Sequence, residues 1–449
     1  MLERTINKAI ADFYRNHSGA LLLTGTRQTG KTYAIRHLGK SFAHFVEINF
    51  VEQPQAIEAF KESRSAQELL LRISSFTNKP LVKGNTLIFF DEVQECKEIV
   101  TAIKFLVDEG SYRYALSGSL LGIELNDLRS EPVGYMNVME MFPLDLEEFV
   151  RAVGVNNMIL EHLSQAFENN TEVDNVIHNK MMQLMQLYLI IGGMPATVQK
   201  YIDSNDLQRV VEEQQAILRL YKRDISKYDK KNKLYIDEIF SLIPSELNAK
   251  NKRFILKNLN ENWRFREKED SFLWLKDAGV ALPTYNVDEP HIPLLLSKSS
   301  RLFKLYQNDV GLLACQYANG IQLNILNGQT NINFGAIYEN VVAQELTAHG
   351  YPLYYFNSKR QGELDFLLEQ NSEIIPVEVK SGKDYTRHVA LNNILSNKEY
   401  DIKKAYVLCN SNIKQVGKVV YLPIYMTMFI RQAVQTQSIK YKIDLSELS

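Results

Sequence analysis

Apolar residues form short continuous runs in the first third of the chain, at Ala20–Leu23, Thr86–Phe90 and Tyr112–Leu116. Polar or glycine-containing segments bound each run. Such runs are typical of strands that are buried on both faces, as in a parallel sheet covered by helices. The pattern predicts an α/β domain, which we place at residues 1–155.

The pattern changes to a helical period near residues 150–175. An apolar, Met-rich stripe with a spacing close to 3.6 residues runs over Ile177–Ile191, and a Gly-Gly-Met-Pro sequence ends it. Leu207–Ile225 is a second long helix. We expect these helices to form a lid at residues 156–230, with the Met-rich face in a core rather than in a cofactor pocket.

Shorter helical segments follow the lid. Apolar spacing predicts helices around Ile236–Ile243, Phe254–Leu259 and Phe272–Ala278, and Pro244 is expected to end the first of them. An extended segment, Val280–Val287, comes next. Short helices followed by an extended segment predict a winged-helix domain at residues 231–300.

Helix and strand signals alternate again from residue 301 to residue 449. The expected order is helix, three strands, helix and strand, at Phe334–His349, Tyr351–Phe356, Glu363–Leu368, Ile374–Lys380, Asn392–Leu395 and Lys404–Leu408. The first helix is expected to be amphipathic. This order predicts a second α/β domain.

Candidate chemistry begins directly after the first apolar run, where GTRQTGKT matches G-x-x-x-x-G-K-S/T. The two glycines let the backbone curl so that successive N–H groups face a phosphate, and the lysine reaches the β- and γ-phosphates. The threonine offers its hydroxyl to Mg²⁺, and the following helix directs its positive N-terminus at the same anion. An ordinary Gly-rich turn is the alternative, which the preceding strand and following helix disfavour. We therefore expect ATP and Mg²⁺ to bind at Gly25, Thr26, Arg27, Gln28, Thr29, Gly30, Lys31 and Thr32.

The apolar run that ends at Phe90 continues into Asp91 and Glu92, the pattern of a Walker B strand. We expect Asp91 to hold Mg²⁺ with Thr32, and Glu92 to polarise the attacking water. A metal and a phosphate remove the repulsion between acids at the edge of a buried sheet. Ser117 ends the next strand, and it either contacts the γ-phosphate or the water, or belongs only to a turn.

Arg223, in the second lid helix, has two interpretations. It either reaches a γ-phosphate, in cis or in trans, and supplies transition-state charge, or it forms a surface ion pair with Asp224 or another acid.

Composition narrows the class of protein. At 449 residues, two to four domains are expected. A net charge of −2 argues against a globally basic surface for nucleic acid. Three distant cysteines, and no uncharged apolar run of about 18 residues, indicate a cytoplasmic protein with reduced thiols and no membrane partner.

One stretch departs from this charge balance. Lys and Arg outnumber Asp and Glu 14 to 9 over residues 221–276. This local excess suits contact with a DNA backbone, and docking within the molecule is the alternative.

A second set of candidate residues lies in the last domain. Glu339 is on the expected helix, Asp365 on the second strand, and Glu378 and Lys380 share one face of the third strand. This arrangement resembles the PD-(D/E)xK nuclease core. Asp365 and Glu378 would coordinate Mg²⁺, Lys380 would act on the attacking water, and Glu339 would complete the site. The alternative is a solvated strand face in a nuclease-like fold without cleavage.

The order of P-loop strand, acidic strand and polar strand, followed by Pro143–Phe149, resembles the AAA-type ATPase module. Over nearly its full length the chain resembles a large family of prokaryotic ATPases, in which this module precedes a winged helix and a C-terminal domain of unknown function. Five phrases carry the resemblance: LIFFDEVQ, FPLDLEEF, GGMP, YKRDISKY and FKLYQNDVGLLA, from Leu87, Phe142, Gly192, Tyr221 and Phe303.

The overall prediction is an α/β protein with an AAA-type P-loop NTPase domain, a helical lid, a winged helix and a restriction-endonuclease-like C-terminal domain. ATP binding or hydrolysis would change how the last two domains engage nucleic acid, with cleavage as a further hypothesis. DNA is the candidate partner and a homo-oligomer the candidate assembly. The competing hypothesis is a signalling switch whose winged helix and C-terminal domain are interaction modules without catalysis.

Overall fold

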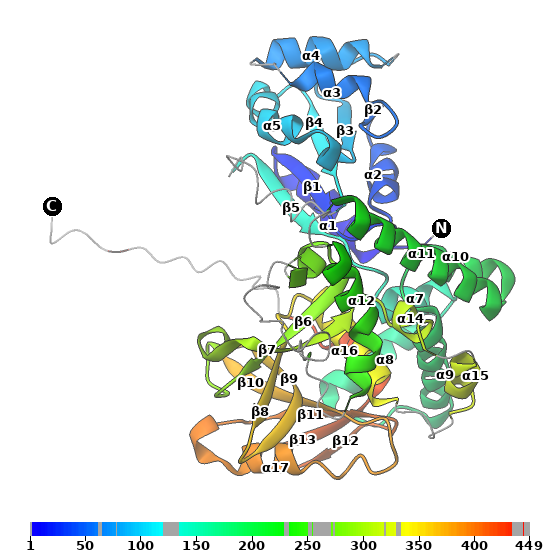
Figure 1. Ribbon diagram of the computed structural model, residues 1–449, viewed down its shortest axis with the longest axis vertical. Helices are drawn as coiled ribbons and strands as arrows, with labels where there is room; N and C mark the ends of the chain where they lie inside the picture. The colour runs from blue at the N-terminus through cyan, green and yellow to red at the C-terminus, as the bar shows by residue number, and fades with distance from the viewer. Residues whose placement is uncertain are drawn as a thin grey trace.

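The computed structural model describes residues 2–61, 65–77, 79–119, 134–228, 233–249, 254, 271–272, 274–317, 320–328, 334–432 and 443. Two sheets lie at opposite ends of the molecule, and helices from the middle of the chain lie between and beside them (Figure 1). Cys96, Cys315 and Cys409 are free thiols.

The N-terminal sheet has five parallel strands in the order β2-β3-β4-β1-β5. The strands are β1 (Ala20–Thr24), β2 (His44–Asn49), β3 (Thr86–Asp91), β4 (Arg113–Ser117) and β5 (Met136–Glu140). The helices that cover it are α1 (Thr5–Asn16), α2 (Lys31–Gly39), α3 (Gln55–Phe60), α4 (Ala66–Ser75) and α5 (Lys97–Glu109), and a 3₁₀ turn, η1 (Val93–Glu95), follows β3.

Alternation along the buried strands explains the two layers of helices. Leu22 and Ile88 point into one core with α3, α4 and α5, whereas Leu21 and Leu87 point into the other with α1 and α2. Because all the strands are parallel, their carboxyl ends meet at one edge of the sheet. The segments after β1, β3 and β4 therefore lie together, as the sequence predicted.

Helices from the middle of the chain join the two sheets. They are α7 (Leu146–Ala152), α8 (Asn157–Asn169), α9 (Asn175–Ile191), α10 (Pro195–Ser204), α11 (Leu207–Tyr228) and α12 (Lys233–Asn248). The predicted Met-rich stripe is core, with Met181 and Met185 buried on α9. This core continues without a break into the C-terminal sheet, from Leu144 to Ile430.

The expected helix break at Pro244 is wrong, because α12 runs through this residue. A proline inside a helix removes one hydrogen bond and costs about 3 kcal/mol. The apolar stripe of α12 nevertheless continues past the proline, from Ile243 to Leu247, and both side chains are buried. Burial of that stripe offsets the lost hydrogen bond.

The C-terminal sheet has eight strands in the order β12-β13-β11-β10-β9-β8-β6-β7. They are β6 (Ala281–Val287), β7 (Lys298–Gln307), β8 (Tyr354–Ser358), β9 (Gly362–Gln370), β10 (Glu373–Val379), β11 (Ala405–Cys409), β12 (Lys414–Val416) and β13 (Val419–Pro423). Its helices are α14 (Val310–Ala314), α15 (Ile321–Leu326), α16 (Gly335–Ala348) and α17 (Val389–Ser396). The 3₁₀ segments are η3 (Leu294–Ser297), η4 (Lys398–Tyr400) and η5 (Ile424–Phe429).

The predicted order of elements after residue 334 is present, as α16, β8, β9, β10, α17 and β11. The extended segment expected to be a wing is β6, which pairs with β7 on one side and with β8 on the other. The predicted domain boundary between residues 300 and 301 falls inside β7. Most of residues 250–270, where a helix of the winged helix was expected, lie outside the described residues.

The expected amphipathic character of α16 is wrong. Side chains on every face of this helix are buried from Ala336 to Leu346. The helix packs against α9, α12, α14, β6, β7, β10 and η5, so no face is left for solvent. Its polar residues, Glu339 among them, are therefore buried in the centre of the molecule.

Three of the phrases quoted above, GGMP, FKLYQNDVGLLA and FPLDLEEF, are in contact at the junction between the two sheets. Gly193, of the GGMP phrase, donates its backbone N–H to Asp309 Oδ2 at 2.6 Å and accepts from Leu144 N at 2.7 Å. Asp309 is fully buried, and burial raises its pKa to about 6. The junction is thus held by backbone contacts too close to admit a side chain.

We expect Gly193→Ala to lower the free energy of unfolding by about 3 kcal/mol or more, since a clash with fixed backbone forces a shift of the chain. A Cβ at this position would lie 2.0 Å from the Leu144 carbonyl oxygen. Chemical denaturation measures the change. Gly382→Ala is the control, because a Cβ at Gly382 meets no atom within 4 Å. Equal stability of the two variants would contradict this account of the junction.

Candidate functional site

The predicted phosphate loop connects β1 to α2 at the carboxyl edge of the N-terminal sheet. Gly25, Gln28 and Gly30 have φ angles of 134°, 67° and 96°, which curl the loop. A Cβ on Gly25 would lie 2.2 Å from the Met141 carbonyl oxygen, so this position admits glycine alone. The loop therefore has the backbone shape that the sequence predicted.

Lys31 points back into its own loop. Its ammonium donates to the carbonyl oxygens of Gly25 at 2.9 Å and of Thr26 at 2.7 Å. Burial lowers the pKa of Lys31 to about 8, and the carboxylates of Glu92 and Asp91 partly oppose this shift. A bound phosphate would offer this ammonium an anionic partner in place of two neutral carbonyls.

The lowered pKa of Lys31 predicts a pH dependence for ATP binding. Bound phosphates raise the pKa of this ammonium, so binding above pH 8 must take up a proton. Affinity is expected to be constant below about pH 8 and to fall up to about tenfold per pH unit above it. Isothermal titration over this range measures the effect. Lys31→Arg is the control, since a guanidinium does not titrate there; a wild-type affinity that stays constant to about pH 9.5 would contradict the prediction.

Asp91 lies at the centre of a polar network at the ends of three strands. Its carboxylate accepts from Thr32 Oγ1 and from Asn49 Nδ2, each at 3.0 Å, and from the Ser117 hydroxyl. Burial raises the pKa of Asp91. Thr32 and Asp91 together present hard oxygen ligands of the kind that Mg²⁺ prefers. Ser117 thus donates to Asp91, the residue that the sequence analysis predicted to be a Mg²⁺ ligand.

Glu92 follows Asp91 in a left-handed conformation, with a φ angle of 57°. Its backbone N–H donates to Asp91 Oδ1 at 3.1 Å, and its carboxylate accepts from the Gln94 side chain. A non-glycine residue in this conformation is uncommon and marks a constrained position. The negative charge of Glu92 raises the pKa of Lys31 and so partly opposes the effect of burial.

Three separate parts of the chain contact the phosphate loop. Arg27 forms an ion pair of 2.7 Å with Asp224 on α11. Thr26 Oγ1 accepts from Asn308 Nδ2, in the segment after β7, at 3.5 Å. Arg4, before α1, donates to the Thr29 carbonyl oxygen at 3.0 Å and pairs with Glu148 at 2.8 Å. The loop is therefore bonded both to the lid and to the part of the chain from β6 onward, which we call the C-terminal unit.

The alternatives for Arg223 remain predictions. Arg223 is exposed on α11, and the ion pair with its neighbour Asp224 is made by Arg27.

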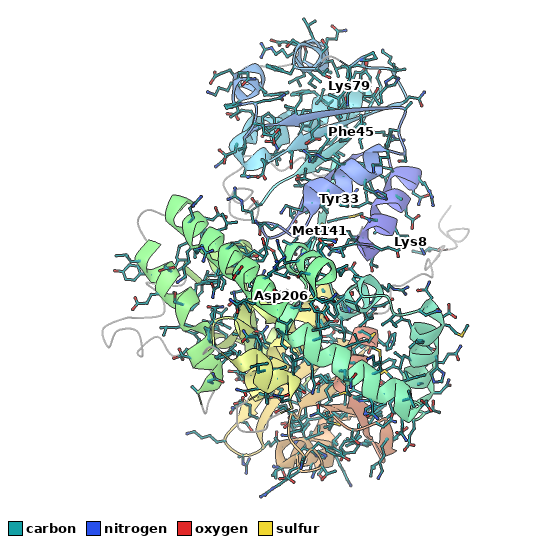
Figure 2. The ribbon with its side chains drawn as sticks, turned by 90° about the vertical axis from the view of Figure 1, so that its right-hand side faces the viewer. Lys8, Tyr33, Phe45, Lys79, Met141 and Asp206 are labelled. Atoms are coloured by element: carbon teal, nitrogen blue, oxygen red, sulfur yellow. The ribbon has the colours of Figure 1, made fainter. Side chains whose placement is uncertain are left out.

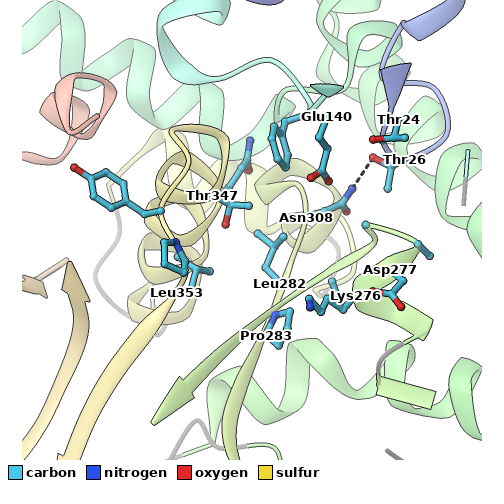
Figure 3. Close-up of a pocket in the computed structure, with 18 of the residues that line it drawn as sticks. Thr24, Thr26, Glu140, Lys276, Asp277, Leu282, Pro283, Asn308, Thr347 and Leu353 are labelled. Atoms are coloured by element: carbon cyan, nitrogen blue, oxygen red, sulfur yellow. Dashed lines mark hydrogen bonds between the residues drawn. The ribbon is translucent and has the colours of Figure 1, made fainter. Parts of the chain in front are cut away.

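Two cavities adjoin the loop on different sides. The larger, of about 480 Å³, extends from Thr26 and Glu140 past Leu282 to Thr347 and Leu353 of the C-terminal unit (Figure 3). The smaller, of about 320 Å³, lies between the loop and the N-terminal segment, and Tyr33 and Met141 line it (Figure 2). Leu2, Pro195 and Ala196 complete its mainly apolar wall.

The second predicted set of residues is brought together at one place in the C-terminal unit. Glu339 of α16 and Asp365 of β9 lie 3.6 and 3.9 Å from the ammonium of Lys304 on β7, a residue that the sequence analysis missed. The charge of Lys304 also acts on Glu378 of β10, and Lys380 directly follows that strand. Lys380 Nζ lies 2.7 Å from Glu378 Oε1. Burial raises the pKa of Glu378, which the Lys380 charge partly offsets. Within the described ranges, no three His, Cys, Asp or Glu side chains are arranged to hold a metal ion.

Sequence reasoning missed the residues that reach these sites from distant segments. Asn49 ends a strand, but only the strand order of the sheet places it beside the acidic strand. Asp224, Asn308 and Lys304 lie in the YKRDISKY and FKLYQNDVGLLA phrases, whose physical role the sequence did not show. Their contacts join segments that are far apart along the chain, so spacing carried no signal of them.

Three family matches cover most of the chain. Residues 17–150 match the AAA domain family, residues 182–323 match a domain of unknown function (DUF8612), and residues 334–426 match another (DUF4143). No curated protein matches the chain. The match at residues 17–150, with the loop geometry above, identifies an AAA-type P-loop ATPase domain. The family matched by the C-terminal unit has no assigned function and does not support a nuclease.

Solved structures of two archaeal proteins are among those similar to this chain. A Walker-type ATPase of Pyrococcus abyssi is 14% identical, with 70% of this chain and 96% of that chain covered and a TM-score of 0.43. The ORC1 protein of Aeropyrum pernix, solved in complex with DNA, is 13% identical, with 72% and 90% covered and a TM-score of 0.23. At these values neither protein informs on the chemistry of this chain.

In the part of the chain that the structure describes, no single helix is long and apolar enough to span a membrane. The pair α9 and α10 meets both criteria only when taken together, and these two helices are bent by 119° at their junction. Much of α9 packs into the core described above.

Proposed function

We propose that this protein is an ATP-dependent switch, in which nucleotide at the P-loop changes how the lid and the C-terminal unit are held. One observation carries the proposal. Two consecutive side chains of the loop, Thr26 and Arg27, are bonded to Asn308 and to Asp224, which belong to those two parts of the molecule. A change in the loop therefore acts on both parts without an intermediate.

We infer that the triphosphate lies against the loop and that the base enters the cavity of about 320 Å³. Apolar and aromatic walls with a few polar groups are usual for such pockets. Thr32 and Asp91 would hold Mg²⁺, which supplies charge stabilisation for the phosphates when bound. Glu92 would polarise the attacking water, since it directly follows Asp91 at the end of β3 and its charge acts on Lys31.

The proposed coupling begins at Lys31. In this proposal, the ammonium gives up its bonds to the carbonyl oxygens of Gly25 and Thr26 when it turns toward the phosphates. The backbone of Thr26 is then released, and the contacts of Thr26 and Arg27 with Asn308 and Asp224 are changed. In the proposed mechanism these contacts oppose nucleotide binding, so a ligand that breaks them shifts the equilibrium away from the arrangement in which they are made.

This mechanism predicts that Asp224→Asn raises ATP affinity by about tenfold. The hydrogen bond between Asp224 and Arg27 is partly buried and joins charged groups; such a bond contributes about 1.5–3 kcal/mol, which in the proposed mechanism opposes nucleotide binding. Titration calorimetry with ATP measures the change, and hydrogen exchange of α11, which carries Asp224, should lose its response to ATP. Asp203→Asn, at an exposed carboxylate on α10, is the control. An affinity that is unchanged or reduced in Asp224→Asn would show that the ion pair does not oppose nucleotide binding.

A second candidate function is nucleic-acid binding with metal-dependent cleavage. The observation in its favour is that Glu339, Asp365, Glu378 and Lys380 gather at one place, as the nuclease-like hypothesis requires. A cleavage assay with Mg²⁺ or Mn²⁺ tests it. If cleavage is observed and both a chelator and Asp365→Ala abolish it, the nuclease hypothesis would be supported over the hypothesis of a switch without catalysis. DNA binding that weakens with salt, without cleavage, would fit the switch with DNA as its partner.

A further inference from the structure

The centre of the carboxylate cluster in the C-terminal unit holds a lysine. Lys304 has no exposed surface, and its ammonium lies 2.8 Å from Glu363 Oε1. It lies 3.6 Å from Glu339 Oε2 and 3.9 Å from Asp365 Oδ1. A fully buried lysine is rare unless carboxylates balance its charge. Here three of them, from α16 and β9, face the same nitrogen.

The carboxylates of the cluster already have donors within the chain. Glu339 Oε2 accepts from the Tyr306 hydroxyl at 2.9 Å, and Asp365 Oδ2 accepts from Val379 N at 2.8 Å. Glu378 Oε1 accepts from Lys380 Nζ at 2.7 Å, whereas its buried Oε2 has no hydrogen-bond partner among the described residues. These donors hold each group in an orientation that serves the protein's own cations and N–H groups. A divalent ion needs the same oxygens at about 2.0–2.6 Å.

We infer that Lys304 is the resident cation of this cluster, in the position where the nuclease-like hypothesis places Mg²⁺. An ammonium among these carboxylates and a divalent ion bound by them would repel each other at short range in a buried site. The residues present therefore do not fit a divalent ion while Lys304 is in place. The C-terminal unit is a site closed by its own lysine, and it does not depend on a divalent metal.

The inference has a specific consequence for metal binding. Removing the ammonium leaves Glu339, Glu363 and Asp365 without their shared cation, and a divalent ion is the natural replacement for it. Lys304→Met removes the charge and keeps an unbranched chain of similar length. This variant should gain a divalent-ion site that the wild-type chain lacks.

The experiment measures Mn²⁺ binding to nucleotide-free protein from the loss of the free-ion electron paramagnetic resonance signal. Every protein carries Asp91→Asn, so that the P-loop does not contribute ligands. We expect the Lys304→Met protein to bind one Mn²⁺ at least about tenfold more tightly than the protein with Lys304. Adding Asp365→Asn should remove this binding. Lys298→Met, on the same strand, is the matched control and should gain no site.

Thermal unfolding provides a second test of the inference, which can be used even if Lys304→Met folds poorly. Lys304→Met should have a lower Tm, which Mn²⁺ restores, whereas the Tm of the protein with Lys304 should not respond to Mn²⁺. Binding of one Mn²⁺ to the protein with Lys304 that Asp365→Asn abolishes would overturn the inference. A folded Lys304→Met protein that binds no Mn²⁺ would overturn it as well. If Lys304→Met does not fold under any condition, the protein with Lys304 is the test: Mn²⁺ binding that depends on Asp365 would overturn the inference, and no such binding would support it.

Discussion

Lys31→Ala is expected to lose measurable ATP binding. Lys31 is the only side-chain ammonium in the predicted loop, and its two present hydrogen bonds are to carbonyl oxygens that a phosphate would replace. A hydrogen bond between charged groups contributes about 1.5–3 kcal/mol, so losing contacts with two phosphates lowers affinity by about 100-fold or more. Equilibrium binding of a fluorescent ATP analogue measures the loss.

The control for this experiment is Lys40→Ala, which removes an exposed lysine at the end of the same helix. Its affinity should match that of the wild type, because the side chain lies outside the loop. If Lys31→Ala bound ATP as tightly as the wild type, the assignment of the phosphate loop would be wrong.

Glu92→Gln is expected to keep ATP binding and to lose hydrolysis by about 10²–10⁴-fold, the usual contribution of a general base. The amide has the shape of the carboxylate but cannot polarise the attacking water to the same extent. Its removal of negative charge near Lys31 should leave the phosphate contacts in place. Phosphate release under saturating ATP measures turnover, and the binding assay above confirms occupancy.

Glu98→Gln is the matched control for turnover, since Glu98 is an exposed acid on the neighbouring helix. Turnover should be unchanged in this variant. Wild-type turnover in Glu92→Gln would assign water activation to another group, and would leave the phosphate-loop assignment untouched.

The nucleotide site was largely predictable because its residues are local in sequence. The loop from Gly25 to Thr32 is one continuous motif, and Asp91 and Glu92 end one apolar run. The strand before the loop and the helix after it were equally predictable from the sequence. Only the identity of the polar side chain opposite, Asn49, needed the strand order of the sheet, which places β2 beside β3.

The surroundings of both sites were not predictable, for two physical reasons. A lysine in a strand has the same sequence signal whether it is solvated or buried, and the burial of Lys304 depends on Glu339 and Glu363, which are distant in sequence. An extended segment likewise looks the same as a wing or as an internal strand. The pairing of β6 with β8, across a long insertion, decided between them.

The continuous core from Leu144 to Ile430 has a consequence for how the molecule unfolds. Parts that share one apolar interior unfold together, whereas a part with its own interior melts independently. Most of the N-terminal sheet is packed in cores of its own. We therefore expect two cooperative unfolding transitions, whereas the four predicted domains remain a prediction. A truncation at residue 300 would open the second of these cores through the middle of β7.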